Sequence, residues 1–125
     1  MEIIKEGNVN SEELKDRTKK FAIATIHFVQ QLPKAYEVKI IGSQLIRSST
    51  SVAANYRAAC RSRSQNEFYS KICIVVEEAD ESIFWLEVLN EAKMAGGEKL
   101  EVLMKEATEL TQIFASTRKT LKSNL

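Results

Sequence analysis

Hydrophobic positions recur at intervals of three and four residues along almost the whole chain, which is the period of amphipathic α-helices. Asn10 followed by Glu13 matches a capping box, a pattern that starts a helix. Pro33 disfavours helical geometry in the residue before it, so a helix that begins after Asn10 should end near Gln31. The apolar stripe of this first predicted helix consists of Leu14, Thr18, Phe21, Thr25, Phe28 and Leu32.

A second helix is predicted over residues 37–60, and its stripe includes two polar residues, Ser48 and Asn55. Polar groups on a core-facing stripe need hydrogen-bond partners. Serine can bond back to a carbonyl four residues earlier, which would satisfy Ser48 locally. We therefore expect Asn55 to bond across to a facing helix and to fix its register. The apolar positions of this stripe are Val38, Ile41, Leu45, Val52, Tyr56 and Ala59.

Two further helices complete the pattern. Ser64 with Glu67 forms a second capping box, and the periodicity that follows predicts a third helix reaching about Met94. The segment Ala-Gly-Gly at residues 95–97 should end that helix, with glycine in the left-handed cap. The stripe of the third helix is Phe68, Ile72, Val75, Val76, Ala79, Ile83 and Leu86, and that of the fourth is Leu100, Leu103, Ala107, Leu110, Phe114, Thr117 and Leu121.

Four amphipathic helices with short joints predict an all-α fold, an antiparallel up-down-up-down four-helix bundle. We expect an N-terminal tail at residues 1–10, the bundle over residues 11–121 and a frayed C-terminus at residues 122–125. A chain of 125 residues with 44% hydrophobic and 28% charged residues has the size and composition of one ordinary globular domain.

The composition offers no candidate metal or cofactor site. Cys60 and Cys73 are thirteen positions apart and the single histidine, His27, is distant from both, whereas structural zinc needs about four clustered ligands. The N-terminus lacks the apolar run of a secretory signal. The longest apolar run, residues 72–76, is far shorter than the roughly 20 residues of a membrane span. We expect a soluble, cytoplasmic protein with no cofactor and no membrane partner.

Catalytic motifs are also missing from the sequence. There is no glycine-rich phosphate loop, no GxSxG and no HExxH. The acids between Glu77 and Glu81 lie off the core stripe and lack the Glu-x-x-His partners of di-iron bundles. We therefore predict no catalytic residues, no enzyme activity and no small-molecule substrate.

The outer sides of the second and third helices carry small or apolar residues where a monomeric bundle would be polar. Such a combination indicates a buried contact with another chain, and we interpret it as a self-association surface. Its predicted members are Ile40, Gln44, Ser51 and Ala58 on the second helix, and Ile74, Trp85, Val88 and Leu89 on the third.

Charge is segregated along the chain. Residues 39–71 contain six basic side chains and one acid, whereas residues 72–98 contain seven acids and one base. The candidate phosphate-binding residues are Lys39, Arg47, Arg57, Arg61 and Arg63. Two interpretations are open: these residues bind nucleic-acid phosphates, or they are a solvated basic face or form ion pairs with acids of the third helix or of another subunit. The net charge of +1 favours the ion pairs.

Residues 44–89 resemble a bacterial family of four-helix bundles named for proteins encoded in intervening sequences of 23S rRNA genes. The matching positions are Arg47, Ser51, Asn55, Arg61, Phe68, Glu81 and Leu86. The family usually has Glu-Gly shortly after the asparagine, where this chain has Arg57-Ala58, so a role of that acid is not transferred. The resemblance implies a ring-like homo-oligomer, commonly a pentamer. It also implies kinship with the basic accessory protein of diversity-generating retroelements, which binds nucleic acid beside a reverse transcriptase.

Two functions from different classes follow. The first, which the resemblance places ahead, is a nucleic-acid-associated accessory module that binds an RNA or DNA backbone through a basic face of the second helix. The alternative is a structural or protein-interaction scaffold whose arginines form ion pairs between subunits. The first predicts binding that weakens steeply with salt, and the second predicts no such binding.

Overall fold

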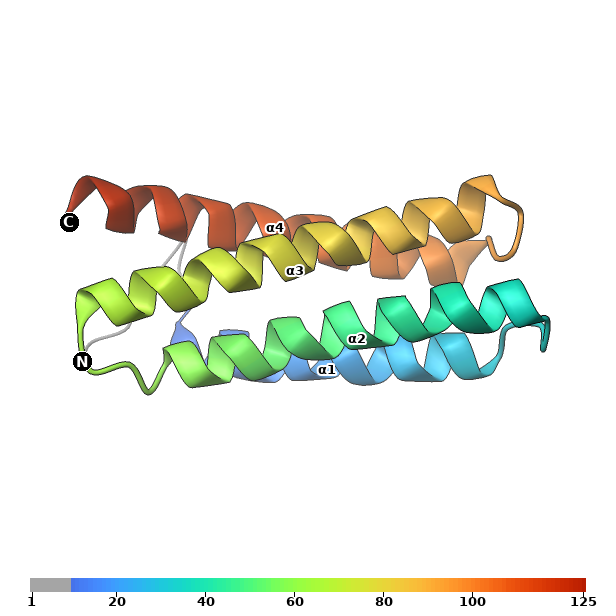
Figure 1. Ribbon diagram of the computed structural model, residues 1–125, viewed down its shortest axis with the longest axis horizontal. Coiled ribbons are helices and arrows are strands. Elements are labelled where there is room, and N and C mark those ends of the chain that lie inside the picture. Colours follow the sequence, from blue (N-terminus) through green and yellow to red (C-terminus); the bar gives the residue numbers. More distant parts are fainter. Residues whose placement is uncertain (1–9) are drawn as a thin grey trace.

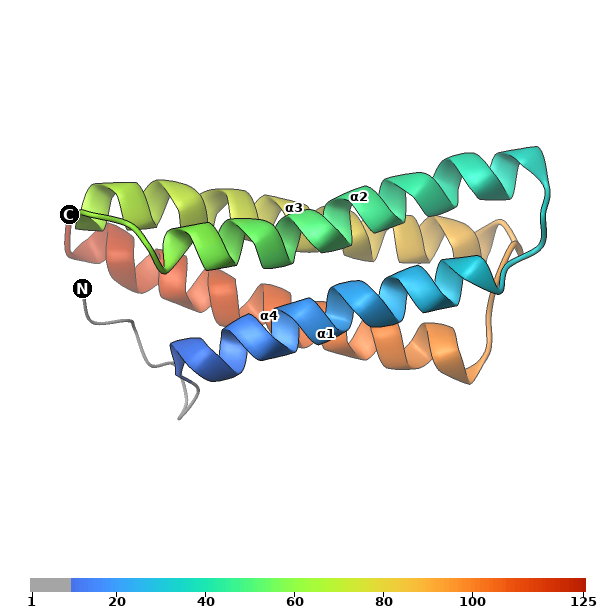
Figure 2. The ribbon, with the colours of Figure 1, turned by 90° about the horizontal axis from the view of Figure 1, so that it is seen from below.

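The computed structural model describes residues 10–125, which fold into four antiparallel helices (Figures 1 and 2). The helices are α1 (Ser11–Gln30), α2 (Tyr36–Ala59), α3 (Gln65–Glu91) and α4 (Glu98–Ser123). Neighbouring pairs are α1/α2, α2/α3, α3/α4 and α1/α4, so α2 lies diagonally opposite α4. The predicted up-down bundle is confirmed. Residues 1–9 of the predicted tail lie outside the described residues, and α4 continues two residues beyond the predicted limit of the bundle.

Both predicted N-terminal caps are present. The Asn10 side-chain oxygen accepts a hydrogen bond from the Glu13 backbone N–H at 2.9 Å, and the Ser64 hydroxyl accepts one from the Glu67 backbone N–H at 3.1 Å. Each bond satisfies a backbone donor that has no partner within the first helical turn. The starts of α1 and α3 are therefore determined locally by the sequence.

The end of α3 differs from the prediction. The helix stops at Glu91, and the left-handed residue that follows it is Lys93, with φ of 60°. The backbone N–H groups of Met94 and Ala95 both bond to the Leu89 carbonyl at 2.9 and 3.1 Å, which closes the helix end. Gly97 has φ of 85° but caps the start of α4 instead. The prediction that glycine ends α3 near residue 94 is wrong.

The core is a continuous apolar cluster along the bundle axis, and aromatic rings of the diagonal helices meet in it. The ring centroids of Tyr56 on α2 and Phe114 on α4 are 5.0 Å apart. Leu89 is also part of this core, with no exposed surface. Its predicted place at a subunit interface is therefore wrong, because its side chain is already buried within its own bundle.

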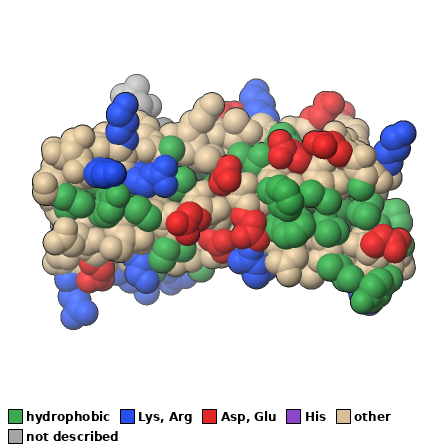
Figure 3. All heavy atoms as spheres, turned by 45° about the horizontal axis from the view of Figure 1, so that its top comes forward, with side chains coloured by type: hydrophobic (Ala, Val, Ile, Leu, Met, Phe, Trp, Pro, Cys, Tyr) green, Lys and Arg blue, Asp and Glu red, His purple; other side chains and the backbone are tan. Residues whose placement is uncertain are grey.

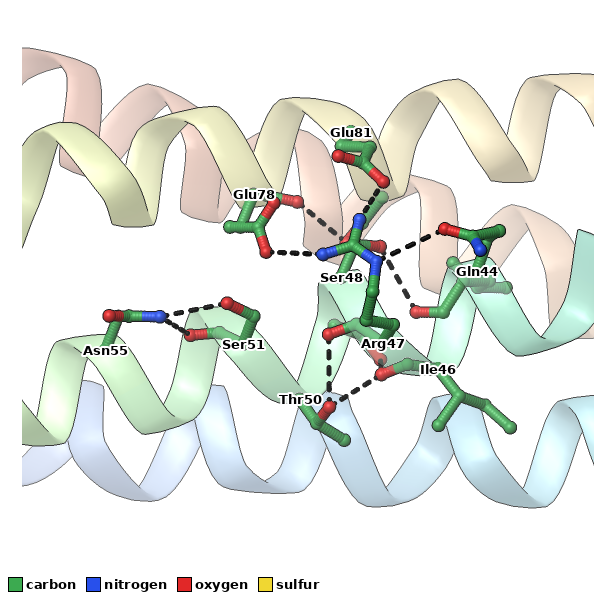
Figure 4. Close-up of polar contacts among 12 residues, drawn as sticks. Gln44, Ile46, Arg47, Ser48, Thr50, Ser51, Asn55, Glu78 and Glu81 are labelled. Carbon is green, nitrogen blue, oxygen red and sulfur yellow. Dashed lines mark hydrogen bonds and ion pairs between the residues drawn. The ribbon is translucent and has the colours of Figure 1, made fainter.

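Buried hydroxyl groups supply the cross-helix bond that we expected from Asn55. The hydroxyl oxygens of Ser48 on α2 and Ser82 on α3, both fully buried, lie 2.9 Å apart. Ser48 also bonds to the Leu45 carbonyl at 3.2 Å. The half-buried Asn55 instead donates to the carbonyl and the hydroxyl of Ser51, both at 2.9 Å, within its own helix (Figure 4). The prediction for Asn55 is wrong because a partner one turn away satisfies its amide.

Candidate nucleic-acid interface

Arg47 lies on the side of α2 that faces α3, and carboxylates occupy its guanidinium (Figure 4). Its Nη1 donates to Glu78 at 2.8 Å, its Nη2 donates to Glu81, and its Nε donates to Gln44 at 3.2 Å. The indole Nε1 of Trp85 donates to the same Glu81 oxygen at 2.9 Å. These bonds join α2 to α3. They leave Arg47 poorly placed to bind a phosphate.

The pKa values of this cluster shift as its geometry requires. Hydrogen bonds from Trp85 and then from Arg47 lower the pKa of the Glu81 carboxyl below its ordinary value. Hydrogen bonds to Glu81 and then to Glu78 raise the pKa of the Arg47 guanidinium. Both groups are thus held in their charged forms. This pairing with the acids of α3 is what the ion-pair interpretation predicted for the arginines, here within one chain.

Arg57 lies near the C-terminal end of α2 and Arg61 in the turn just after it, where both line a groove against α1. The groove has a volume of about 630 Å³. Both arginines are exposed, and one helical turn separates them, so they can contact neighbouring phosphates. Lys15 and Lys19 of α1 line the same groove. The structure thus adds two lysines that the sequence analysis did not assign.

The acids of this groove are paired with lysines of their own helix. Glu12 binds Lys15 at 2.7 Å and Asp16 binds Lys20 at 2.9 Å. Within residues 10–125, no carboxylate forms an ion pair with Arg57 or Arg61. The positive charge of these two arginines is therefore available to a ligand.

The remaining candidate cations are exposed but do not form one stripe with this pair. Arg63 lies in the joint between α2 and α3, close to Arg61 in the chain. Lys39 is near the start of α2, about 27 Å from Arg57 at the helical rise of about 1.5 Å per residue. The basic face predicted along all of helix two is therefore reduced to its C-terminal end.

Cys60 lines the groove beside the arginines, but its environment does not favour the reactive thiolate. Partial burial raises the pKa of the Cys60 thiol, outweighing the hydrogen bond with Tyr56 that lowers it. A thiol that stays protonated is a weak nucleophile. The groove thus supplies positive charge rather than an activated nucleophile.

The second predicted surface, for self-association, is partly exposed on α2 and α3. Ile40 is 44% and Ile74 is 38% exposed, and Phe84, which the sequence analysis did not assign, is 50% exposed. Phe84 packs edge-on against the ring of Trp85, with centroids 4.8 Å apart. Figure 3 shows hydrophobic side chains gathered toward the end where α3 joins α4, bordered by acidic side chains. Gln44, Ser51, Ala58, Trp85 and Val88 are half-buried.

Among residues 10–125, no three His, Cys, Asp or Glu side chains gather closely enough to hold a metal ion. None of the four described helices is long and apolar enough to cross a membrane.

The sequence pattern of the 23S rRNA-intervening sequence protein family matches residues 11–116. The chain belongs to this family. The match extends the resemblance seen at residues 44–89 to α1, α2, α3 and most of α4. A crystal structure of a protein of unknown function from the S23 ribosomal protein family of Bacteroides thetaiotaomicron VPI-5482 is similar, with a TM-score of 0.77 and 29% identity, covering 87% of this chain and 97% of that chain. No curated protein matches.

Proposed function

We propose that this member of the 23S rRNA-intervening sequence protein family is a non-enzymatic, homo-oligomeric accessory protein that binds the phosphate backbone of RNA or DNA. The observation that carries the proposal is the pair Arg57 and Arg61. Both are exposed and line one groove together with Lys15 and Lys19, and no carboxylate among the described residues pairs with either arginine. Unpaired cations at helical spacing suit a backbone that carries a charge on every nucleotide.

The homo-oligomer is a separate part of the proposal. The exposed apolar side chains of Ile40, Ile74 and Phe84 support it, since exposed apolar groups on neighbouring helices are typical of protein contacts. The family resemblance suggests a ring, commonly a pentamer. In such a ring, each copy would add its own pair of groove arginines to one surface. Light scattering of the purified protein measures the mass of the oligomer and therefore its number of subunits.

If nucleic acid binds in the groove, replacing the groove arginines should make its binding less dependent on salt. Each lost phosphate contact lowers the slope of log affinity against log salt by about 0.7 for single strands and about 0.9 for duplex. Changing Arg57 and Arg61 together to Gln should therefore weaken binding and flatten the slope by about 1.4 on a single strand. A matched control is Lys93→Gln with Lys99→Gln, which removes the same charge from two exposed residues near the joint of α3 and α4.

The alternative is a scaffold that binds no nucleic acid. The pairing of Arg47 with Glu78 and Glu81 of its own chain is compatible with it only in that this arginine is already occupied and is not a phosphate contact. A wild-type protein that binds neither RNA nor DNA at low salt would refute nucleic-acid binding and leave the scaffold. Dissociation of the oligomer in the variant with Arg57→Gln and Arg61→Gln would show that these arginines hold subunits together.

A further inference from the structure

The bundle is electrically polarised along its long axis, which is not evident from the linear sequence. The half that contains residues 11–20, 49–77 and 111–125 carries eleven Lys and Arg against five Asp and Glu. The other half, residues 21–48 and 78–110, carries six Lys and Arg against ten Asp and Glu. The antiparallel topology brings the N-terminus of α1, the joint of α2 and α3, and the C-terminus of α4 to the same end (Figures 1 and 2).

The end of α4 contributes to this basic end, and the sequence analysis did not assign it. Residues 111–125 contain no acid, and their cations are Arg118, Lys119 and Lys122. Lys119 and Lys122 are exposed, and Arg118 is half-buried. The hydrogen bond with Cys73 raises the pKa of the Tyr69 phenol, at the start of α3, and the positive charge of Arg118 is close enough to act against this rise. This places Arg118 beside the first turns of α3.

Acids do not neutralise this end. Among the described residues, the ion pairs in this half are those of Glu12 and Asp16 with lysines of α1, and that of Arg17 with acids of α4. The three α4 cations form none. Together with Arg57, Arg61 and Arg63, they make the end of the bundle a positively charged cap, which we call the basic end.

The cations of the basic end lie on opposite sides of the bundle, and this decides which nucleic acid can reach them all. α2 and α4 are diagonal neighbours across the core, and each helix is about 10 Å across. Duplex DNA is stiff over about 150 base pairs and can lie along only one side of such an end. A single strand can bend over it, from the groove of α1 and α2 past Arg63 to α4.

We infer that the basic end is a binding surface for single-stranded RNA or DNA, with Arg118, Lys119 and Lys122 of α4 contacting the strand together with the groove arginines Arg57 and Arg61. The inference rests on the proposed function and specifies its ligand as a single strand. It assigns three new contact residues and excludes Lys39 and Arg47, which lie in the other half of the bundle.

The test compares three variants by fluorescence anisotropy on a labelled oligothymidine and on a duplex of the same length, over a range of salt. The variant Arg118→Gln, Lys119→Gln, Lys122→Gln should lower the single-strand slope by up to about 2, at about 0.7 per contact. The same variant should keep the wild-type slope on the duplex. The control Lys93→Gln, Lys99→Gln, Lys105→Gln removes the same charge from the other half and should leave both slopes unchanged.

Several results would overturn the inference. An α4 variant with the wild-type single-strand slope, alongside weakened binding by the variant with Arg57→Gln and Arg61→Gln, would overturn it while the proposed function stands. An equal loss in the control would show that only net charge matters. An equal loss on the duplex would overturn the single-strand assignment. If the triple variant loses helicity, the exposed pair Lys119→Gln and Lys122→Gln makes the same comparison. A wild type that binds no nucleic acid would refute the proposed function itself.

Discussion

Leu89 is predicted from the sequence to lie at a subunit interface, but an apolar residue at this position can equally belong to the core. A substitution of Leu89 distinguishes the two roles. In the structure its side chain is fully buried within its own bundle. We expect Leu89→Ala to lower the free energy of unfolding by about 2–5 kcal/mol, the range for buried leucines whose removal leaves a cavity. The total free energy of unfolding of a natural domain is only about 5–15 kcal/mol, so this loss would be a large part of it.

Two control substitutions show whether the loss comes from removing a fully buried side chain. Val88→Ala changes the adjacent, half-buried residue, and at about 0.8 kcal/mol per buried methylene it should lose about 1 kcal/mol or less. Leu89→Met conserves volume and should lose less than about 1.5 kcal/mol. Urea unfolding followed by circular dichroism gives all three values, because a shift in midpoint at constant slope reports stability alone.

A subunit-interface role would give a different result. Leu89→Ala would then leave a folded chain of lower mass in light scattering, and its unfolding midpoint would depend on protein concentration. A variant with the wild-type midpoint but a smaller mass would refute the assignment of Leu89 to the core.

Three further predictions concern polar groups. Ser48→Ala removes the hydroxyl that bonds to Ser82 and should lower the free energy of unfolding by about 0.5–1.5 kcal/mol. Ser62→Ala should be neutral or stabilising in the same urea assay, because the buried Ser62 hydroxyl has no partner among residues 10–125; a loss as large as that of Ser48→Ala would contradict this. Glu81 has a lowered pKa when folded, so its stabilisation is present above the ordinary value of 4.5 and is lost as pH falls through the lower, folded value. Glu81→Gln should therefore flatten the pH dependence of stability below about pH 4.5, and an unchanged profile would show that Arg47 and Trp85 do not stabilise the carboxylate.

The sequence alone determined the helices and their order, because their signals are local. A cap such as Ser64 with Glu67 acts within one turn, and the three-four alternation of apolar residues is read without knowing any partner. Antiparallel packing then followed from the short joints between the helices.

The wrong predictions for Leu89 and Asn55 have one physical cause, the helical repeat that was assumed when the apolar stripes were extended along the chain. Stepping each residue by 100° assumes 3.6 residues per turn, which drifts about 20° per heptad from a 3.5-residue repeat. All but one of the buried positions of α3, the exception being Val76, follow an alternation of four and three: Phe68, Ile72, Val75, Ala79, Ser82, Leu86 and Leu89. Over three heptads the difference is about 60°, enough to place Leu89 outside the predicted stripe. On α2 the same repeat runs through Tyr56, leaving Asn55 at its edge.

Only the tertiary structure decided which cations are available. Four of the six arginines lie between residues 47 and 63, and α3, the next helix, is rich in acids, so either pairing was possible from sequence. Packing places Arg47 against Glu78 and Glu81, while Arg57 and Arg61 turn toward α1. The basic end is also a product of topology, because the joint of α2 and α3 and the C-terminal end of α4 come to the same end of the bundle only when the four helices alternate in direction (Figures 1 and 2). Charge pairing depends on distances between helices, and no local pattern encodes those distances.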